Sequence, residues 1–178
     1  KNALSNAMYR AATAALERAK EGKSIRVVII GSEGDSFTSG NDLADFAAAA
    51  MGGEPPAAGA FIEAIAQFPK PLVAAVPGLA VGVGTTMLLH CDLVFIARDA
   101  KLTTPFVNLA LVPEAASSML MPAHIGHRRA FAMFALGEAL TGEQAVALGI
   151  ANTAMAASEV LGAFWLSVFY PASVRRAL

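Results

Sequence analysis

Residues 70–84 read KPLVAAVPGLAVGVG, and the fold class can be inferred from this stretch. Leu72–Val76 is a continuous apolar run with the length of a buried parallel strand, and Pro77-Gly78 turns the chain at its end. Val83–His90 then continues as an apolar helix. A buried strand, a glycine-bearing turn and a helix in succession indicate an α/β fold with at least partly parallel strands.

The same alternation extends in both directions along the chain. Ile25–Ile30 and Leu93–Ala97 are expected to be buried strands, Lys101–Thr103 a short strand, and Gly31–Gly40 a loop. Ser5–Lys20 is predicted to be an amphipathic helix that ends at Gly22. Its apolar side is expected to carry Met8, Ala12, Ala15, Leu16 and Ala19. Further helices are predicted at Leu43–Ala50, Phe61–Phe68, Ser117–Ile125, Arg128–Leu136 and Gly142–Leu148.

Composition and net charge limit the kinds of molecule that the protein is expected to bind. The chain has 178 residues, 56% of them hydrophobic and only 15% charged, whereas about 25% charged is typical. Such a chain favours an oligomer, and its net charge of −1 gives no electrostatic reason to expect nucleic acid or an anionic membrane. The longest apolar run, Pro71–Val83, is broken by Pro77 and glycines, so it is no membrane span. Cys91 is the only cysteine, and His124 and His127 lack a third ligand, so no metal site is predicted.

Thr104–Ser118 places one carboxylate, Glu114, in an otherwise uncharged run of apolar and small residues. Two glycine-bearing turns upstream, Phe37–Leu43 and Gly78–Gly84, could supply backbone N–H donors to a developing negative charge. One isolated base with backbone donors is the equipment for moving a proton beside a carbonyl. The alternatives are structural: Glu114 as an ordinary carboxylate near a helix start, and the Gly78–Gly84 turn as tight strand–helix packing. Asp42 is expected to cap the helix that follows it.

These residues together resemble the crotonase, or enoyl-CoA hydratase/isomerase, superfamily over roughly residues 1–152. The resemblance implies a spiral of ββα units with a helical C-terminal region, and a homotrimer or dimer of trimers. It divides the chain into a crotonase-like acyl-CoA-binding core, residues 1–152, normally preceded by an N-terminal hairpin, and a C-terminal helical or interface segment, residues 153–178. The segments that carry the resemblance are Lys1–Leu4, Ile25–Ile30, Ser39–Leu43, Lys70–Val76, Gly78–Gly84, Cys91-Asp92, Pro105–Pro113, Leu140–Glu143 and Ala147–Gly149.

Within this superfamily the positions of the carboxylates indicate the reaction. The hydratase pattern has two glutamates, which would fall at Thr86 and Phe106 of this chain, and both are absent. A hydroxyl and a phenyl ring cannot replace two carboxylates in activating water. Pro113-Glu114 instead resembles the Δ3,Δ2-enoyl-CoA isomerase branch, in which a single glutamate after the proline shuttles the proton.

The resemblance implies a role for each residue of the site. Glu114 would carry a proton from C2 to C4 of a 3-enoyl-CoA, while the backbone N–H groups of Asn41 and Val83 form the oxyanion hole. Phe106 and Leu109 would face the acyl chain, although core packing explains them about as well. Coenzyme A enters as part of the substrate, and no other cofactor is implied. The remaining substrate-binding positions implied are Ala3, Ser39, Gly40, Asp42, Leu43 and Gly82.

Two other functions stay open from the sequence. One is a different enolate-type reaction of a CoA thioester, hydratase-like in outline, and the other is a non-catalytic acyl-CoA-binding or assembly subunit. The bacterial cytoplasm is the expected compartment, with a peroxisome or mitochondrion as the eukaryotic alternative. Phe164–Leu166 and Val168–Tyr170 are expected to form a packing or interface segment.

Overall fold

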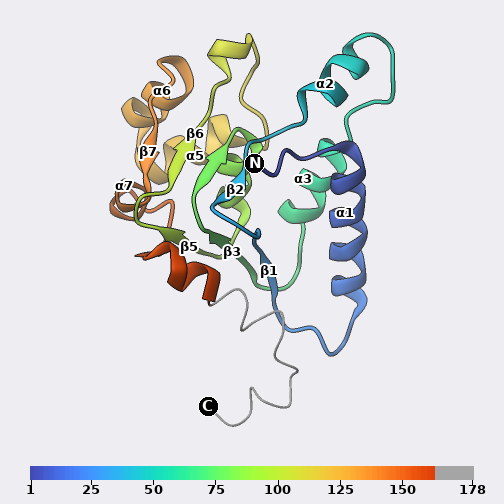
Figure 1. Ribbon diagram of the computed structural model, residues 1–178, viewed down its shortest axis with the longest axis horizontal. Helices are drawn as coiled ribbons and strands as arrows, with labels where there is room; N and C mark the ends of the chain where they lie inside the picture. The colour runs from blue at the N-terminus through green and yellow to red at the C-terminus, as the bar shows by residue number, and fades with distance from the viewer. Residues whose placement is uncertain (163–178) are drawn as a thin grey trace.

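The computed structural model describes residues 1–162, in which successive turns of an α/β spiral add strands to two separate four-stranded sheets (Figure 1). The expected packing segment at residues 164–170 lies outside the described residues. The predicted α/β class with mostly parallel strands is confirmed, since only the last pairing of the second sheet is antiparallel.

The first sheet has the strand order β1-β3-β5-β8, and all its strands are parallel. The predicted strands at Leu72–Val76 and Leu93–Ala97 are confirmed with the expected bounds. The strand expected at Ile25–Ile30 is shorter and only half-buried, because it lies at an edge of the sheet. The expected C-terminal segment begins with β8, which pairs with β5 in the core sheet. The strands are β1 Val28–Ile30, β3 Leu72–Val76, β5 Leu93–Ala97 and β8 Thr153–Met155.

The second sheet has the order β2-β4-β6-β7 and is built from strands of two or three residues. The prediction that residues 31–40 form only a loop was wrong, because residues 36–38 pair in parallel with residues 79–81. The strand at residues 79–81 was not predicted either, since glycines and a proline flank it. The expected strand at Lys101–Thr103 is confirmed and pairs with both neighbours. The strands are β2 Ser36–Thr38, β4 Leu79–Val81, β6 Lys101–Thr103 and β7 Leu140–Thr141.

The helices follow the predicted positions with two differences. The helix expected at Phe61–Phe68 begins three residues earlier and ends at Ala66. The apolar helix expected at residues 83–90 is a four-residue α-helix that continues as a 3₁₀ turn. Residues 157–162 are also helical. The α-helices are α1 Asn6–Glu21, α2 Leu43–Ala50, α3 Ala58–Ala66, α4 Val83–Thr86, α5 Ser117–Ile125, α6 His127–Ala135 and α7 Gly142–Ala147, and the 3₁₀ turns are η1 Met87–His90 and η2 Val107–Leu109.

The buried face of α1 differs from the prediction, because Met8 and Ala15, both expected on the apolar side, are exposed. Tyr9, rather than Met8, faces the core: Tyr9 is 3% exposed and Met8 45%. The helical period of 3.6 residues places Tyr9 in line with Leu16 and Ala19, both buried. Ser5 caps the helix by accepting a hydrogen bond from the backbone N–H of Met8.

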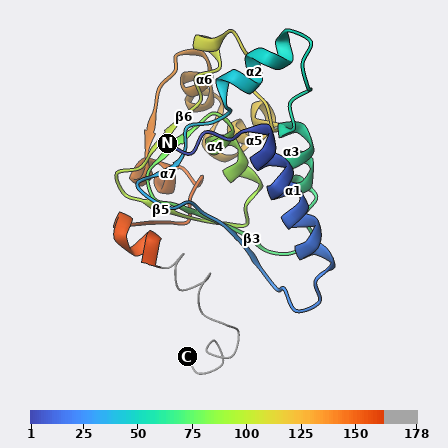
Figure 2. The ribbon, with the colours of Figure 1, turned by 45° about the vertical axis from the view of Figure 1, so that its right-hand side comes forward.

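The helices cover the sheets from two sides. Figure 2 shows α1 and α3 packed together on one side and α6 and α7 on the other. The core is continuous, with buried apolar side chains from both sheets and from the helices. Among the described residues, no helix has the length and apolar character needed to cross a membrane.

Candidate active site

The carboxyl ends of β2, β4 and β6 lie at one edge of the second sheet, because these three strands are parallel neighbours. The chain segments that leave these ends carry the residues singled out from the sequence: Asn41 after β2, Val83 after β4 and Glu114 after β6. Loops at the carboxyl ends of parallel strands are where α/β proteins commonly bind ligands. The topology therefore brings together three candidate residues that are far apart in the sequence.

The backbone N–H of Asn41 is the first of two unpaired donors at this edge in residues 1–162. Leu4 pairs in parallel with Asn41, accepting from the N–H of Asp42 at 3.0 Å and donating to the carbonyl of Gly40 at 2.8 Å. Successive N–H groups of extended backbone point to opposite sides, so the Asn41 N–H points away from Leu4. It donates to no acceptor within residues 1–162. Gly40 makes this possible, because it has φ +88° and a Cβ there would lie 3.0 Å from the carbonyl oxygen of Val81.

The backbone N–H of Val83 is the second unpaired donor. Val83 is the first residue of α4, so its N–H has no partner within the helix. Gly82, with φ +56°, turns the chain from β4 into α4 and is held by its N–H bond to the carbonyl of Thr103. Thr85 fixes the same turn, donating its hydroxyl to the carbonyls of Ala80 at 2.9 Å and Thr103 at 3.0 Å. Within the described chain, the Val83 N–H also has no acceptor.

Glu114 is the carboxylate of this site, and Thr86 holds it. The Thr86 hydroxyl donates to Glu114 Oε1 at 2.5 Å, and Thr86 is fully buried. Thr86 lies one helical turn after Val83, so this bond joins the carboxylate to the same short helix whose first N–H is the second donor. Burial raises the pKa of Glu114, and the Thr86 hydrogen bond and the nearby His90 offset only part of that rise.

The loop that carries Glu114 has an unusual backbone. Ala115 and Ala116 both have φ +53°, a left-handed conformation that costs energy for any residue with a Cβ. His90 Nε2 donates to the carbonyl of Ala115 at 2.9 Å, and the Ser117 N–H donates to the carbonyl of Glu114 at 2.9 Å. These bonds hold the strained loop so that Glu114 faces Thr86. His90, the last residue of η1, therefore lies beside the site.

Tyr9 is a site residue that the sequence reasoning missed. It lies on the buried face of α1, and its hydroxyl donates to Asn41 Oδ1. Burial raises the pKa of Tyr9, and the negative charge of Glu114 adds to the rise, so this phenol lies near the same carboxylate. A correct helical phase for α1 would have shown an aromatic residue with a polar tip on the buried face, which is a signal available in the sequence.

The other positions implied for the substrate are spread along the same edge. Ala3 lies beside Ser39, whose N–H donates to the carbonyl of Lys1 at 2.9 Å. Asp42 caps α2, as expected, by accepting from the N–H groups of Ala44 and Asp45. Leu43 is 68% exposed on the first turn of α2, where a bound ligand could cover it.

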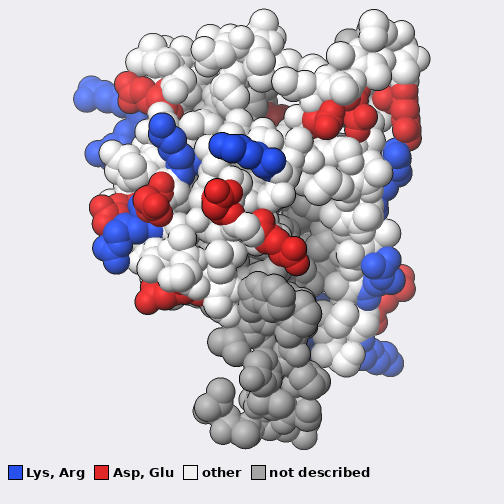
Figure 3. Space-filling view, viewed as in Figure 1, with Lys and Arg blue, Asp and Glu red and all other residues white. Residues whose placement is uncertain are grey.

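Phe106 and Leu109 have different surroundings. Phe106 is 5% exposed and its ring packs against Phe134 at 5.8 Å between centroids, whereas Leu109 is 49% exposed on η2. Core packing thus accounts for Phe106, and Leu109 is free to meet a ligand. Figure 3 shows that the upper rim of the molecule, over α2 and the η2 loop, carries few charged side chains.

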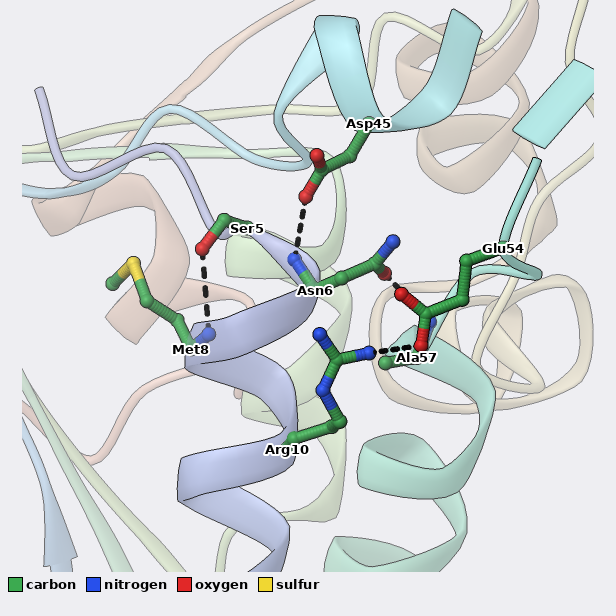
Figure 4. Close-up of polar contacts among 7 residues, drawn as sticks. All are labelled: Ser5, Asn6, Met8, Arg10, Asp45, Glu54 and Ala57. Carbon is green, nitrogen blue, oxygen red and sulfur yellow. Dashed lines mark hydrogen bonds and ion pairs between the residues drawn. The ribbon is translucent and has the colours of Figure 1, made fainter. Parts of the chain in front are cut away.

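A polar cluster ties α2 and the start of α3 to the first turns of α1 (Figure 4). The Asn6 N–H donates to Asp45 Oδ2 at 2.7 Å, and the Ala57 N–H donates to Asn6 Oδ1 at 2.8 Å. Arg10 and Glu54 form an ion pair next to them. Both flanks of the segment 51–57 are therefore anchored to the helix that carries Tyr9.

The arrangement is suited to acid–base chemistry with one carboxylate. Two unpaired backbone N–H groups can stabilise negative charge on an oxygen, and a half-buried carboxylate with a raised pKa can take and return a proton. In residues 1–162, no three His, Cys, Asp or Glu side chains lie together as metal ligands would. The chemistry that these residues can perform is proton transfer next to a stabilised oxyanion.

Comparisons with known proteins agree with this architecture. The family model described as enoyl-CoA hydratase/isomerase matches residues 1–168. Enoyl-CoA delta isomerase 2 of Rattus norvegicus is 39% identical over 156 residues, which cover 84% of this chain and 40% of the rat protein. The 2,3-dehydroadipyl-CoA hydratase of Escherichia coli is 33% identical over 156 residues, covering 85% of this chain and 60% of that enzyme. The chain thus spans about half the length of these two relatives.

Solved structures show the same fold. Pseudomonas aeruginosa OdaA superposes with a TM-score of 0.84 at 44% identity, covering 98% of this chain and 73% of OdaA. The enoyl-CoA hydratase/isomerase of Pseudoalteromonas atlantica gives a TM-score of 0.84 at 37% identity, covering 98% of this chain and 72% of that structure. With its two-sheet spiral and its match over residues 1–168, this chain belongs to the enoyl-CoA hydratase/isomerase family of the crotonase superfamily.

Proposed function

We propose that the protein is an acyl-CoA double-bond isomerase that converts a 3-enoyl-CoA into the conjugated 2-enoyl-CoA. The observation that carries the proposal is the hydrogen bond from Thr86 to Glu114. Thr86 occupies a position where the hydratase pattern has a glutamate, and here it serves as a donor to the carboxylate of Glu114. A single carboxylate suits the transfer of a proton between two carbons, which requires no activated water.

In the proposed reaction, the thioester carbonyl accepts hydrogen bonds from the backbone N–H groups of Asn41 and Val83. Glu114 removes a proton from C2, and negative charge passes to the thioester oxygen as a dienolate, which the two donors stabilise. Glu114 then returns the proton at C4, and the double bond moves from C3–C4 to C2–C3. Atoms and charge balance without a cofactor, and Glu114 ends in its starting state.

The raised pKa of Glu114 supports the role of a proton carrier. A carboxylate with an ordinary pKa is a weak base, and burial makes the ionised form more reactive toward a proton. The Thr86 hydroxyl limits this rise and holds one oxygen. The second oxygen, Oε2, is left to face the substrate carbon.

The proposal also covers the oligomeric state of the protein and its cellular compartment. A homotrimer is supported by apolar side chains exposed on α5, on α6 and at the residue that follows α6, which a neighbouring copy could cover. The bacterial cytoplasm remains the proposed compartment, and oxidation of unsaturated fatty acids the proposed pathway class. The exposed side chains are Met119 (67%), Phe131 (54%) and Leu136 (66%).

The test is the appearance of the ultraviolet band of a conjugated thioester when the protein meets a 3-enoyl-CoA. Glu114→Gln keeps the size of the side chain and removes the base, so the rate should fall by about 10³-fold or more. Glu63→Gln, an exposed carboxylate on α3, is the matched control and should retain the wild-type rate.

The same protein should also be given a 2-enoyl-CoA, because a hydratase is among the relatives. Loss of the conjugated band in that assay, with no band formed from the 3-enoyl-CoA, would replace the isomerase with a hydratase. Binding of both thioesters without turnover of either would indicate a non-catalytic acyl-CoA-binding subunit.

A further inference from the structure

We propose that Tyr9 is a positioning residue of the oxyanion hole, holding the side chain of Asn41 so that the Asn41 backbone N–H keeps its direction. The inference rests on the proposed function of Asn41 as a donor to the thioester oxygen. It assigns a role to a helix, α1, that contributes no other polar side chain to the carboxylate or to the two donors among the described contacts.

The contact is direct and joins a buried residue to a half-buried one. The Tyr9 hydroxyl donates to Asn41 Oδ1, and Tyr9 is 3% exposed. The raised pKa of Tyr9 keeps the phenol protonated, so it remains a donor through the working pH range. A buried hydroxyl that lost this acceptor would be left without a partner, which makes the pairing energetically strong.

Within residues 1–162, the main chain around Asn41 is held by Leu4 and by the Thr38 hydroxyl, which accepts from the Gly40 N–H at 3.1 Å. Leu4 bonds to the carbonyl of Gly40 and the N–H of Asp42, on the two sides of Asn41. Because a peptide group is planar, the bond from the Leu4 N–H to the Gly40 carbonyl already orients the Gly40–Asn41 peptide, but neither bond to Leu4 holds the Asn41 side chain. The hydrogen bond from Tyr9 holds that side chain and so adds a second restraint on the residue whose N–H is the donor.

Tyr9 is in turn held rigidly. Its ring packs against Phe61 of α3, with 5.5 Å between the ring centroids and 49° between the planes. The polar cluster of Figure 4 ties the first turns of α1 to α2 and α3, one turn of helix from Tyr9. A rigid phenol is what a positioning role requires, because a mobile one would transmit its motion to the donor.

The experiment compares Tyr9→Phe, Asn41→Ala and the double variant. Tyr9→Phe keeps the ring and its packing on Phe61 and removes only the donor, and Asn41→Ala keeps the backbone N–H and removes only the acceptor. Each single variant should lower kcat by about 5–20-fold with KM within about 2-fold, as expected for the loss of one hydrogen bond that acts in the transition state. The double variant should be no slower than the slower single variant, because both remove the same interaction.

A spectroscopic readout separates positioning from general structural damage. A chromophoric 3-arylacryloyl-CoA shifts its absorption band to the red when hydrogen bonds polarise its carbonyl. The shift in the bound complex should shrink in Tyr9→Phe and persist in Ile65→Val, which removes a buried methylene from α3 and leaves the Tyr9–Asn41 hydrogen bond and the Tyr9–Phe61 ring pair in place. Ile65→Val should lower the melting temperature instead.

The outcomes separate this inference from the proposed function. A wild-type red shift with no isomerase turnover would overturn the isomerase while leaving the Tyr9 test intact. A red shift and kcat in Tyr9→Phe equal to those of the wild type would overturn the positioning role. The positioning role would also be overturned if the fold-losses in kcat of Tyr9→Phe and Asn41→Ala multiplied in the double variant, because the two changes would then act independently.

Discussion

The two sheets of this molecule differ in what they bury. The first sheet, β1-β3-β5-β8, is built from apolar runs such as Leu72–Val76, in which Leu72, Ala74 and Val76 are at most 1% exposed. In the part of the chain that the structure describes, every buried serine or threonine lies in the second sheet or in the segments that leave it. These side chains are Ser36, Thr38, Thr85, Thr86, Thr104 and Ser117.

This difference indicates a division of work. Burial of apolar side chains in the first sheet stabilises the fold, but it does not orient particular groups, because the hydrophobic effect is non-directional. The hydroxyl groups of the second sheet make directed bonds, as Thr85 does with two carbonyls and Thr86 with Glu114. Changes in the second sheet should therefore affect activity more than stability, and changes in the first sheet should do the reverse.

Glu114→Gln should give the largest loss of activity of the variants considered, with the fold retained. We expect kcat to fall by about 10³-fold or more while the fold is retained. Burial raises the pKa of Glu114 in the folded state. At neutral and higher pH, the ionised side chain therefore opposes folding, because its charge must be buried. At pH values where the side chain is protonated in both the folded and the unfolded state, this cost is absent. The variant should thus melt at the same or a higher temperature than the wild type at pH 8, and the difference should close below about pH 4. Calorimetry at both pH values would check this, and a variant that melts lower at pH 8 would contradict it.

Gly40→Ala should have the next largest effect, because it strains the backbone that presents the Asn41 N–H. The new Cβ would lie 3.0 Å from the Val81 carbonyl oxygen at φ +88°. We expect a loss of about 10–100-fold in kcat and about 1–3 kcal/mol in stability.

Gly34→Ala is the matched control for this change. Gly34 has a similar φ of +85°, but a Cβ there would meet nothing within 4 Å. Its substitution should cost about 1 kcal/mol with normal kcat, measured by denaturant unfolding and steady-state kinetics. Equal losses of kcat in the two variants would mean that the Asn41 loop has no special role.

Thr86→Val should act mainly on the pH dependence. The Thr86 hydrogen bond lowers the pKa of Glu114, so its removal should raise that pKa further. Because the base must be ionised, the acidic limb of the profile of kcat/KM against pH should move to higher pH. Thr85→Val, which removes the neighbouring hydroxyl from two carbonyls, should lower stability and leave the acidic limb in place. An unmoved limb in Thr86→Val would contradict the assigned contact.

Ile96→Val, in the first sheet, should have the smallest effect on activity. Ile96 is fully buried in β5, and losing one methylene there should cost about 1 kcal/mol of stability. We expect kcat and the pH profile to be unchanged at temperatures where the variant is folded. A change in kcat as large as that of Thr86→Val would remove the distinction between the two sheets.

The sequence predicted the first sheet better than the second, for a physical reason. β3 and β5 are five-residue apolar runs, which hydrophobic patterning detects with the correct bounds. β2, β4 and β7 have two or three residues each, too few for any periodicity, and glycine or polar residues flank them. Their pairing is imposed by neighbouring strands rather than by local preference.

The same contrast applies to the site. Glu114 could be singled out because it is the only charge in its segment, and the two glycine turns because of their composition. The bond from Thr86 to Glu114 and that from Tyr9 to Asn41 join residues far apart in the chain. Such contacts depend on tertiary packing, so spacing alone could not predict them.

The strand order β1-β3-β5-β8 also has a consequence for how the chain folds. Each strand of this sheet adds beside the preceding one, so the sheet grows in a single direction from the first strand to the last. A chain leaving the ribosome can therefore extend one sheet edge as it emerges, without opening pairs already formed. The segments bearing the two backbone donors are synthesised before the one bearing the acid, and vectorial folding would bury that charge only after its partners are in place.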